Sequence, residues 1–192
     1  MEVSLKFSLK NTVILVLIVS LVLALIISTQ LKLPVYSVNY KGKKMNFRTN
    51  LRDAEKVVVI PNEKNLREKI FNNLVDNITI VFKPGDELVN AHYAAEVFEI
   101  TYKLTLAYKL NFAYIPRFNV VNVTSYEGLK GSEENPVVAL IHPIYSNETS
   151  VRVDDSVVYI QGKNSEKLEE QLRNFDLAVA KFLMVALDIK LT

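Results

Sequence analysis

The chain has 192 residues, 49% of them hydrophobic and 23% charged, a composition that supports one packed domain and excludes wholesale disorder. Lysine and arginine total 23 against 21 aspartate and glutamate, and this near balance disfavours a nucleic-acid-binding protein with a strongly basic face. Cysteine is absent and there are two histidines, which excludes disulfides, thiolate metal sites, a thiol nucleophile and a multi-histidine metal site.

The N-terminal segment predicts a membrane anchor. Residues 13–27 are apolar at every position except Ser20, within a 20-residue stretch over 12–31. A helix of that length rises about 30 Å, which matches the hydrocarbon core of a bilayer. A cleaved signal peptide is the alternative, but the residues after the apolar run offer a poor cleavage site. We expect a short tail over 1–11, a single-pass anchor over 12–31 and a soluble domain over 34–192.

Two membrane orientations stay open. More basic residues follow the span than precede it, which favours a cytoplasmic domain. Lys6 and Lys10 before the apolar run are typical of a signal anchor, and long domains cross membranes with little regard to their charge. We expect a cell-membrane protein with its domain outside the cytoplasm. Three glycosylation sequons begin at Asn77, Asn122 and Asn147, about as many as the composition gives by chance.

Strands and helices alternate after the anchor. We expect them in this order: hairpin 35–48, strand 56–60, helix 63–75, strand 78–83, helix 87–110, strand 119–124, strand 137–141, hairpin 150–161 and helix 165–189. Gly42 marks the first hairpin turn, and Asn62 is placed to cap the first helix. The runs 56–60 and 137–141 are apolar without alternation, which predicts strands buried on both faces.

This alternation predicts an α/β fold, a three-layer domain with helices on the faces of a mixed sheet of five to seven strands. The two hairpins would add antiparallel strands. The first hairpin is either an edge of that sheet or a collar close to the membrane, and the sequence does not separate these alternatives.

The last helix carries a seam of apolar residues that repeat with spacing 4, 3, 4 and 3. They are Leu168, Leu172, Phe175, Val179 and Phe182. We favour packing of this helix on the sheet. The alternative is an interaction surface for a partner protein or a second copy of the chain.

Polar residues follow the expected carboxyl ends of the strands, where open α/β sheets bind ligands. They are Lys83, Asp86, His142, Lys163 and Asn164. The turn before the last helix resembles a phosphate-binding turn, although P-loop spacing is missing. His142 could serve as a general base with Ser125, but no Gly-x-Ser-x-Gly elbow occurs. We favour a capped turn and a hydrogen-bonded structural histidine.

His92, Glu96, Glu99 and Lys103 share one face of the helix expected over 87–110. The first three could hold a divalent cation, but a solvated stripe with a Glu99–Lys103 surface pair is favoured. We therefore expect no metal, no cofactor and no catalytic set.

The expected function is that of a membrane-anchored, non-enzymatic interaction or accessory module. It would contact the bilayer through 12–31 and bind a protein partner or a second copy. The alternative is a domain that binds a small anionic ligand or phosphate, or a hydrolase, at the strand-end residues.

Overall fold

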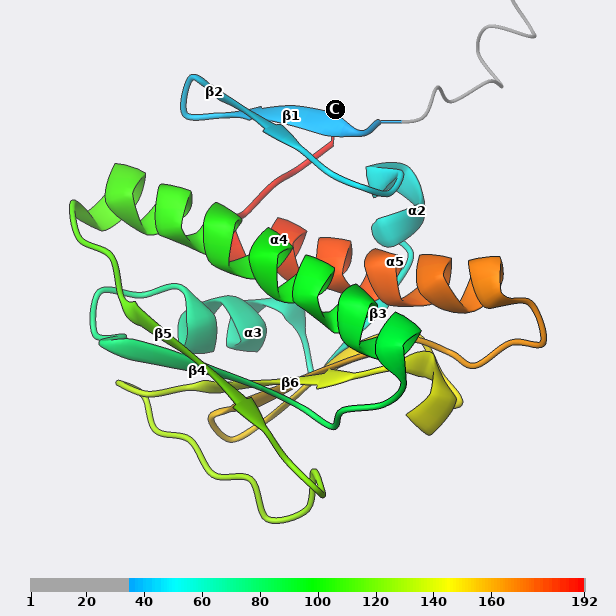
Figure 1. Ribbon diagram of the computed structural model, residues 1–192. Coiled ribbons are helices and arrows are strands. Elements are labelled where there is room, and N and C mark those ends of the chain that lie inside the picture. Colours follow the sequence, from blue (N-terminus) through cyan, green and yellow to red (C-terminus); the bar gives the residue numbers. More distant parts are fainter. Residues whose placement is uncertain (1–34, 192) are drawn as a thin grey trace, which may run out of the picture. The chain divides into compact units, whose positions relative to one another are not determined.

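The computed structural model describes residues 35–191 (Figure 1). The tail and the membrane anchor predicted over 1–11 and 12–31 lie outside the described residues. Within 35–191, no helix combines the length and the apolar character needed to cross a membrane.

A mixed six-stranded sheet in the order β3-β7-β8-β6-β4-β5 forms one layer of the domain. Its strands are β3 (Val58–Ile60), β4 (Asn77–Phe82), β5 (Arg117–Asn122), β6 (Val137–Ile141), β7 (Ser150–Asp154) and β8 (Val157–Gln161). Strands β7 and β8 pair antiparallel through a turn in which Asp155 has a φ of 51°, and the other pairs are parallel. The mixed sheet and the second hairpin are thus confirmed.

Most of the described helices begin where a polar side chain caps the first turn, but the last one follows Lys167 and has no side-chain cap. The described helices are α2 (Leu51–Ala54), α3 (Glu63–Ile70), α4 (Glu87–Phe112) and α5 (Leu168–Ala186), with a 3₁₀ turn, η1 (Pro143–Tyr145). The side chain of Asn62 accepts a hydrogen bond from the amide of Asn65 at 2.9 Å, so the predicted cap of α3 is confirmed. Asp86 caps α4 in the same way, through the amide of Val89.

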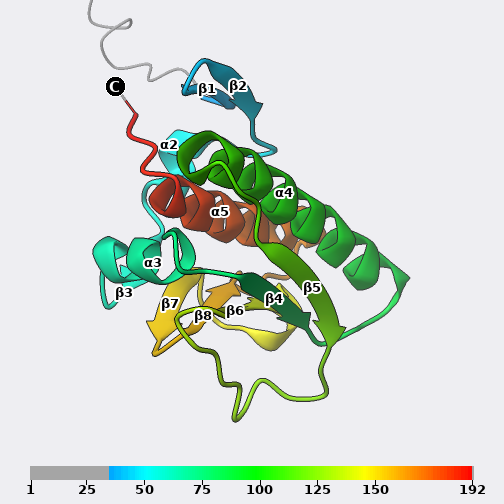
Figure 2. The same ribbon diagram turned by 90° about the vertical axis from the view of Figure 1, so that its left-hand side faces the viewer.

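The helices cover one face of the sheet, which corrects the expectation of helices on both faces (Figures 1 and 2). The other face is covered by the loop over 123–136, through Val123, Tyr126 and Leu129. The Tyr126 hydroxyl donates to the carbonyl of Leu140 at 2.6 Å and accepts from the amide of Lys83 at 2.9 Å. Strand β6 is therefore buried on both faces, as its sequence predicts, but a loop supplies the second cover.

The first hairpin is not an edge of this sheet. Strands β1 (Ser37–Tyr40) and β2 (Lys43–Asn46) form a separate two-stranded sheet. It lies on the side of α4 and α5 that faces away from the large sheet (Figures 1 and 2). Lys41 and Gly42 have φ values of 47° and 78°, so the turn uses the left-handed conformation that glycine adopts without strain.

Strand β3 corrects a second expectation. Its sequence predicts burial on both faces, but it forms an edge of the sheet and pairs only with β7. Val58 is 59% exposed. A run of β-branched residues favours extended backbone, but it does not indicate whether a neighbouring strand or helix covers the resulting strand.

The apolar seam of α5 packs inside the domain, which confirms the favoured interpretation. Phe175, Val179 and Phe182 are buried in the core between α5 and the sheet. This corrects the alternative of a five-residue interaction surface, because these three side chains are not accessible to a partner. Leu168 is exposed and Leu172 is half-buried.

Candidate metal centre

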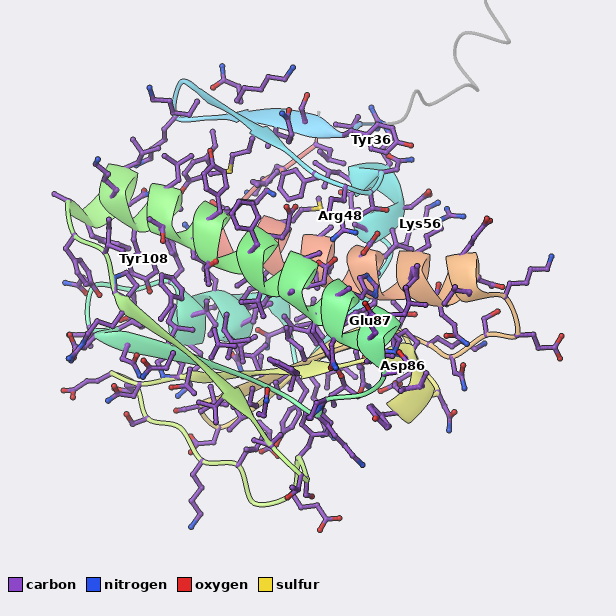
Figure 3. The ribbon with its side chains drawn as sticks, viewed as in Figure 1. Tyr36, Arg48, Lys56, Asp86, Glu87 and Tyr108 are labelled. Atoms are coloured by element: carbon purple, nitrogen blue, oxygen red, sulfur yellow. The ribbon has the colours of Figure 1, made fainter. Side chains whose placement is uncertain are left out.

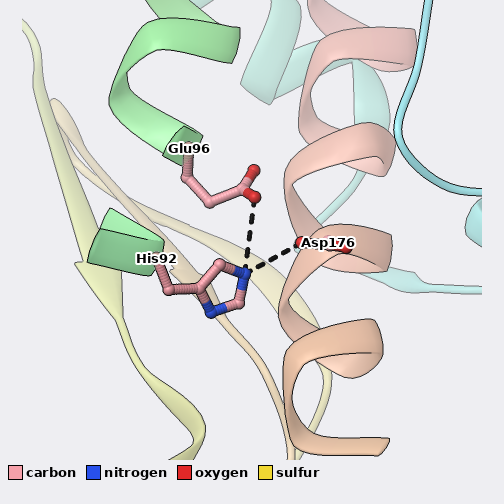
Figure 4. A group of neighbouring side chains, drawn as sticks. All are labelled: His92, Glu96 and Asp176. Atoms are coloured by element: carbon pink, nitrogen blue, oxygen red, sulfur yellow. Dashed lines mark hydrogen bonds and ion pairs between the residues drawn. The ribbon is translucent and has the colours of Figure 1, made fainter. Parts of the chain in front are cut away.

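Three side chains with metal-ligating atoms meet between α4 and α5 (Figure 4). His92 and Glu96 stand one turn apart on α4, and Asp176 faces them from α5. His92 Nε2 lies 2.9 Å from Asp176 Oδ1 and 3.5 Å from Glu96 Oε1. One ligand atom from each residue lies within 4.8 Å of the other two. We call these three residues the metal cluster.

The helix face that carries the metal cluster is buried. Glu96 is 1% exposed, and His92 and Lys103 are also buried. The prediction that this face of α4 is exposed to solvent is therefore wrong. The buried Lys103 pairs with Glu99 on the same helix and lies over the ring of Phe47, with its Nζ 4.5 Å from the ring centroid. Phe47 and α5 cover this face, and both come from parts of the chain distant from α4.

His142 contacts His92 from the side opposite the two carboxylates, at the ring nitrogen Nδ1. His142 Nε2 is 3.5 Å from His92 Nδ1, and His142 Nδ1 faces the amide of Ile144 at 3.4 Å. The backbone amide of His142 donates to the Tyr93 hydroxyl at 3.0 Å, and this hydroxyl lies 3.3 Å from that of Tyr126. Burial, helped by the charge of His92, lowers the pKa of His142 to about 4. His142 is therefore neutral at pH 7.

The pKa values within the metal cluster are moved by burial and by charge. Burial alone would lower the pKa of His92, but the hydrogen bonds and charges of Asp176 and Glu96 raise it to about 9. Burial raises the pKa of Glu96 to about 7, against the opposing effects of His92 and Arg48. For Asp176, burial raises the pKa, but the hydrogen bond with His92 and the positive charges outweigh it, so the pKa is lowered overall.

A groove connects the metal cluster with solvent. Arg48 lies between β2 and α2 (Figure 3), and its NH1 donates to Glu96 Oε1 at 3.0 Å. Arg48 and Asp176 also line a groove of about 590 Å³. The remaining residues of this groove are Tyr36, Thr49, Asn50, Asp53, Glu169, Leu172 and Arg173. Two members of the buried network are thus accessible from one side.

The donor atoms fit a transition-metal ion. Zinc binds imidazole nitrogen and carboxylate oxygen at about 2.0–2.2 Å, which sets such ligand atoms roughly 3–3.5 Å apart. The two distances from His92 Nε2, 2.9 Å to Asp176 and 3.5 Å to Glu96, bracket this spacing, and all three ligand atoms lie within 4.8 Å of one another. One imidazole with two carboxylates is a donor set that suits Mn²⁺, Fe²⁺, Co²⁺ or Zn²⁺.

The residues predicted at the strand ends differ in their surroundings. His142 points inward, against the rings of His92 and Phe175. The charge of Asp86 acts on His142 by raising its pKa, although burial dominates. Lys83 lies over the ring of Tyr145, 4.8 Å from its centroid.

The other predicted residues lie at the surface. Lys163 is exposed, and Asn164 Oδ1 accepts from Gln171 Nε2 at 2.8 Å. A common ligand site for these strand-end residues therefore stays a prediction. So do the sequons, of which Asn122 and Asn147 are exposed and Asn77 is half-buried.

Asp176 and Arg48 were not predicted as site residues from the sequence. Asp176 carried a signal, because it is an acidic residue directly after Phe175 in the apolar seam of the last helix. Arg48 carried none, because it follows a short hairpin among other basic residues. No protein-family model, curated protein or solved structure matches this chain, so its function is inferred from the geometry.

Proposed function

We propose that this chain is a membrane-anchored domain that binds a divalent transition-metal ion through His92, Glu96 and Asp176. The observation that carries the proposal is the convergence of two carboxylates on one imidazole nitrogen. His92 Nε2 bears at most one hydrogen, which cannot serve both carboxylates well at 2.9 and 3.5 Å. A metal ion, in contrast, accepts an electron pair from each of the three atoms at once.

The surroundings of His92 support the same proposal. A histidine that binds a metal through Nε2 usually donates its Nδ1 hydrogen to a fixed acceptor. His142 supplies such an acceptor in the neutral tautomer that carries its hydrogen on Nδ1, with its Nε2 3.5 Å from His92 Nδ1. This tautomer gives up the 3.4 Å contact between His142 Nδ1 and the amide of Ile144. Arg48 holds Glu96 in place from the other side. Both contacts direct ligand atoms toward the centre of the metal cluster.

The ligand count favours an accessible ion. Three protein ligands leave coordination positions open, as in zinc sites that take up water or substrate. Asp176 and Arg48 line the groove, so these positions are reached from solvent on that side. We therefore propose a metal centre whose open coordination positions bind a ligand.

Metal titration tests the proposed function. We expect the full chain, purified in detergent and stripped with chelator, to bind one Zn²⁺ or Mn²⁺ ion per molecule in isothermal titration calorimetry. Asp176→Asn should raise the metal Kd by about 100-fold or more, beyond the 10- to 100-fold typical of groups that only support a ligand. The matched control is Asp188→Asn, at an exposed aspartate just beyond α5 that pairs with Arg67. Equal Kd values for the wild type and Asp176→Asn, or no binding by the wild type, would overturn the proposal.

We also propose partner binding, the function expected from the sequence, through a different helix. On α4, Phe98 and Tyr102 are 67% and 56% exposed, and their rings stack with centroids 5.9 Å apart. Large exposed aromatic side chains are typical of protein interfaces. A photo-crosslinking amino acid at Tyr102 should join the chain in its native membrane to one defined protein or to a second copy. The same substitution at the exposed Lys64 of α3 should give no product, and equal yields at both positions would contradict the proposal.

A further inference from the structure

We infer that the groove beside the metal cluster binds a small anion, through a phosphate or carboxylate group held between the metal ion and the guanidinium groups of Arg48 and Arg173. The inference rests on the proposed metal site and names the class of ligand that reaches it.

The two arginines stand at positions from which they reach one ligand. Arg173 precedes Asp176 by three residues on α5, so both lie on the same side of that helix. Arg48 enters the groove from the segment between β2 and α2 and is 44% exposed. Arg173 NH2 donates to Asp53 Oδ2 at 2.9 Å, and Arg48 NH1 donates to Glu96. A guanidinium has five N–H donors in a planar fork that matches phosphate and carboxylate oxygens.

The charges in the groove couple anion binding to the metal ion. Two arginines face the three carboxylates of Asp53, Glu169 and Asp176, and Lys56 also pairs with Asp53 at 2.9 Å. Without a metal ion these charges balance, so the groove has no net attraction for an anion. A divalent ion on Asp176 adds two positive charges. The anion therefore binds more tightly once the metal ion is in place.

The size and walls of the groove restrict the ligand further. A volume of about 590 Å³ lies in the range of small-molecule sites, and it exceeds what an inorganic anion fills. Tyr36 and Leu172 contribute apolar surface to the same groove. A phosphate or carboxylate group attached to a small apolar body fits these features. That group could belong to a soluble molecule or to a lipid headgroup.

Calorimetry with phenyl phosphate tests the inference on the full chain in a phosphate-free detergent. We expect binding to the Mn²⁺-loaded chain and at least tenfold weaker binding after chelation. Arg173→Gln should weaken phenyl phosphate binding at least tenfold and leave the Mn²⁺ Kd unchanged. Arg67→Gln, which removes an arginine paired with Asp188 outside this groove, should change neither value.

The outcomes separate the two proposals. If Mn²⁺ binds but phenyl phosphate binds equally well without it, or without Arg173, the inference is overturned and the metal site stands. If the wild type binds no Mn²⁺, the proposed function itself fails. A second arm uses vesicles of phosphatidylcholine with phosphatidic acid. Binding to these vesicles that needs both Mn²⁺ and Arg173, without binding of phenyl phosphate, supports the same anion site and assigns it to a lipid headgroup.

Discussion

Replacing His92 with phenylalanine is expected to destabilise the metal-free chain by about 3–5 kcal/mol, the range for removing one partner from a buried ion pair. With a pKa of about 9, His92 is a cation at pH 7 and balances Asp176 and the ionised fraction of Glu96, whose pKa is about 7. The phenylalanine ring fills similar space but leaves the two carboxylates with Arg48 as their neighbouring cation. Urea unfolding of both proteins in chelator at pH 7 measures the difference in the free energy of unfolding.

His142→Phe is the matched control for that measurement. His142 is buried beside His92 but is neutral, because its pKa is about 4. Its replacement removes neutral hydrogen bonds and should cost only about 1–2 kcal/mol. The pH dependence gives a second readout. Since the pKa of His92 is raised on folding, its stabilisation is complete below about pH 6.5 and is lost as the pH rises through about 9. Equal losses for both variants, or the same slope above pH 7 in wild type and His92→Phe, would show that His92 carries no charge.

Phe175→Ala should destabilise the chain by about 3–5 kcal/mol, as expected for truncating a fully buried aromatic side chain. The ring of Phe175 packs edge-on against His92, Tyr93 and His142, with centroids 5.3, 5.9 and 5.8 Å away. The backbone of Gly162 already packs closely against α5, because a Cβ atom added at Gly162 would lie 2.7 Å from the Phe175 backbone nitrogen. The helix therefore cannot move inward to fill the cavity that the truncation leaves. Chemical denaturation in chelator measures the loss.

The control for Phe175→Ala lies on the same seam. Leu168 is 47% exposed, so Leu168→Ala should change the free energy of unfolding by no more than about 0.5 kcal/mol. A loss below 1 kcal/mol for Phe175→Ala would mean that α5 is not held against the sheet as described.

Local signals in the sequence predicted the elements well. The cap at Asn62, the turn at Gly42 and the hairpin over 150–161 each depend on a few neighbouring residues, and all three are found. The cover of each element depends on distant residues, and there the predictions failed. Strand β6 is covered on one face by a loop, and β3 is left as an edge.

The metal cluster shows the same limit. The spacing of His92 and Glu96 predicted that they share a face of α4. Whether that face is exposed to solvent depends on Phe47 and on α5, which are distant in the sequence. Because α4 has apolar residues on several sides, its sequence pattern did not indicate which face is buried. Asp176 lies 84 residues from His92 in the chain. No periodicity within one helix could pair them.

The loop over 123–136 is connected by hydrogen bonds to side chains on the opposite face of the sheet that it covers. Because the Tyr126 hydroxyl gives its hydrogen to Leu140, it can only accept from Tyr93. The Tyr93 hydroxyl hydrogen then points toward the loop, and its lone pairs point toward the backbone of His142. Each group in this chain therefore donates to the next, from the His142 amide through the hydroxyls of Tyr93 and Tyr126 to the carbonyl of Leu140 in β6. The acceptor that holds the backbone amide of His142 is therefore itself held in place by a side chain from the loop on the other face of the sheet.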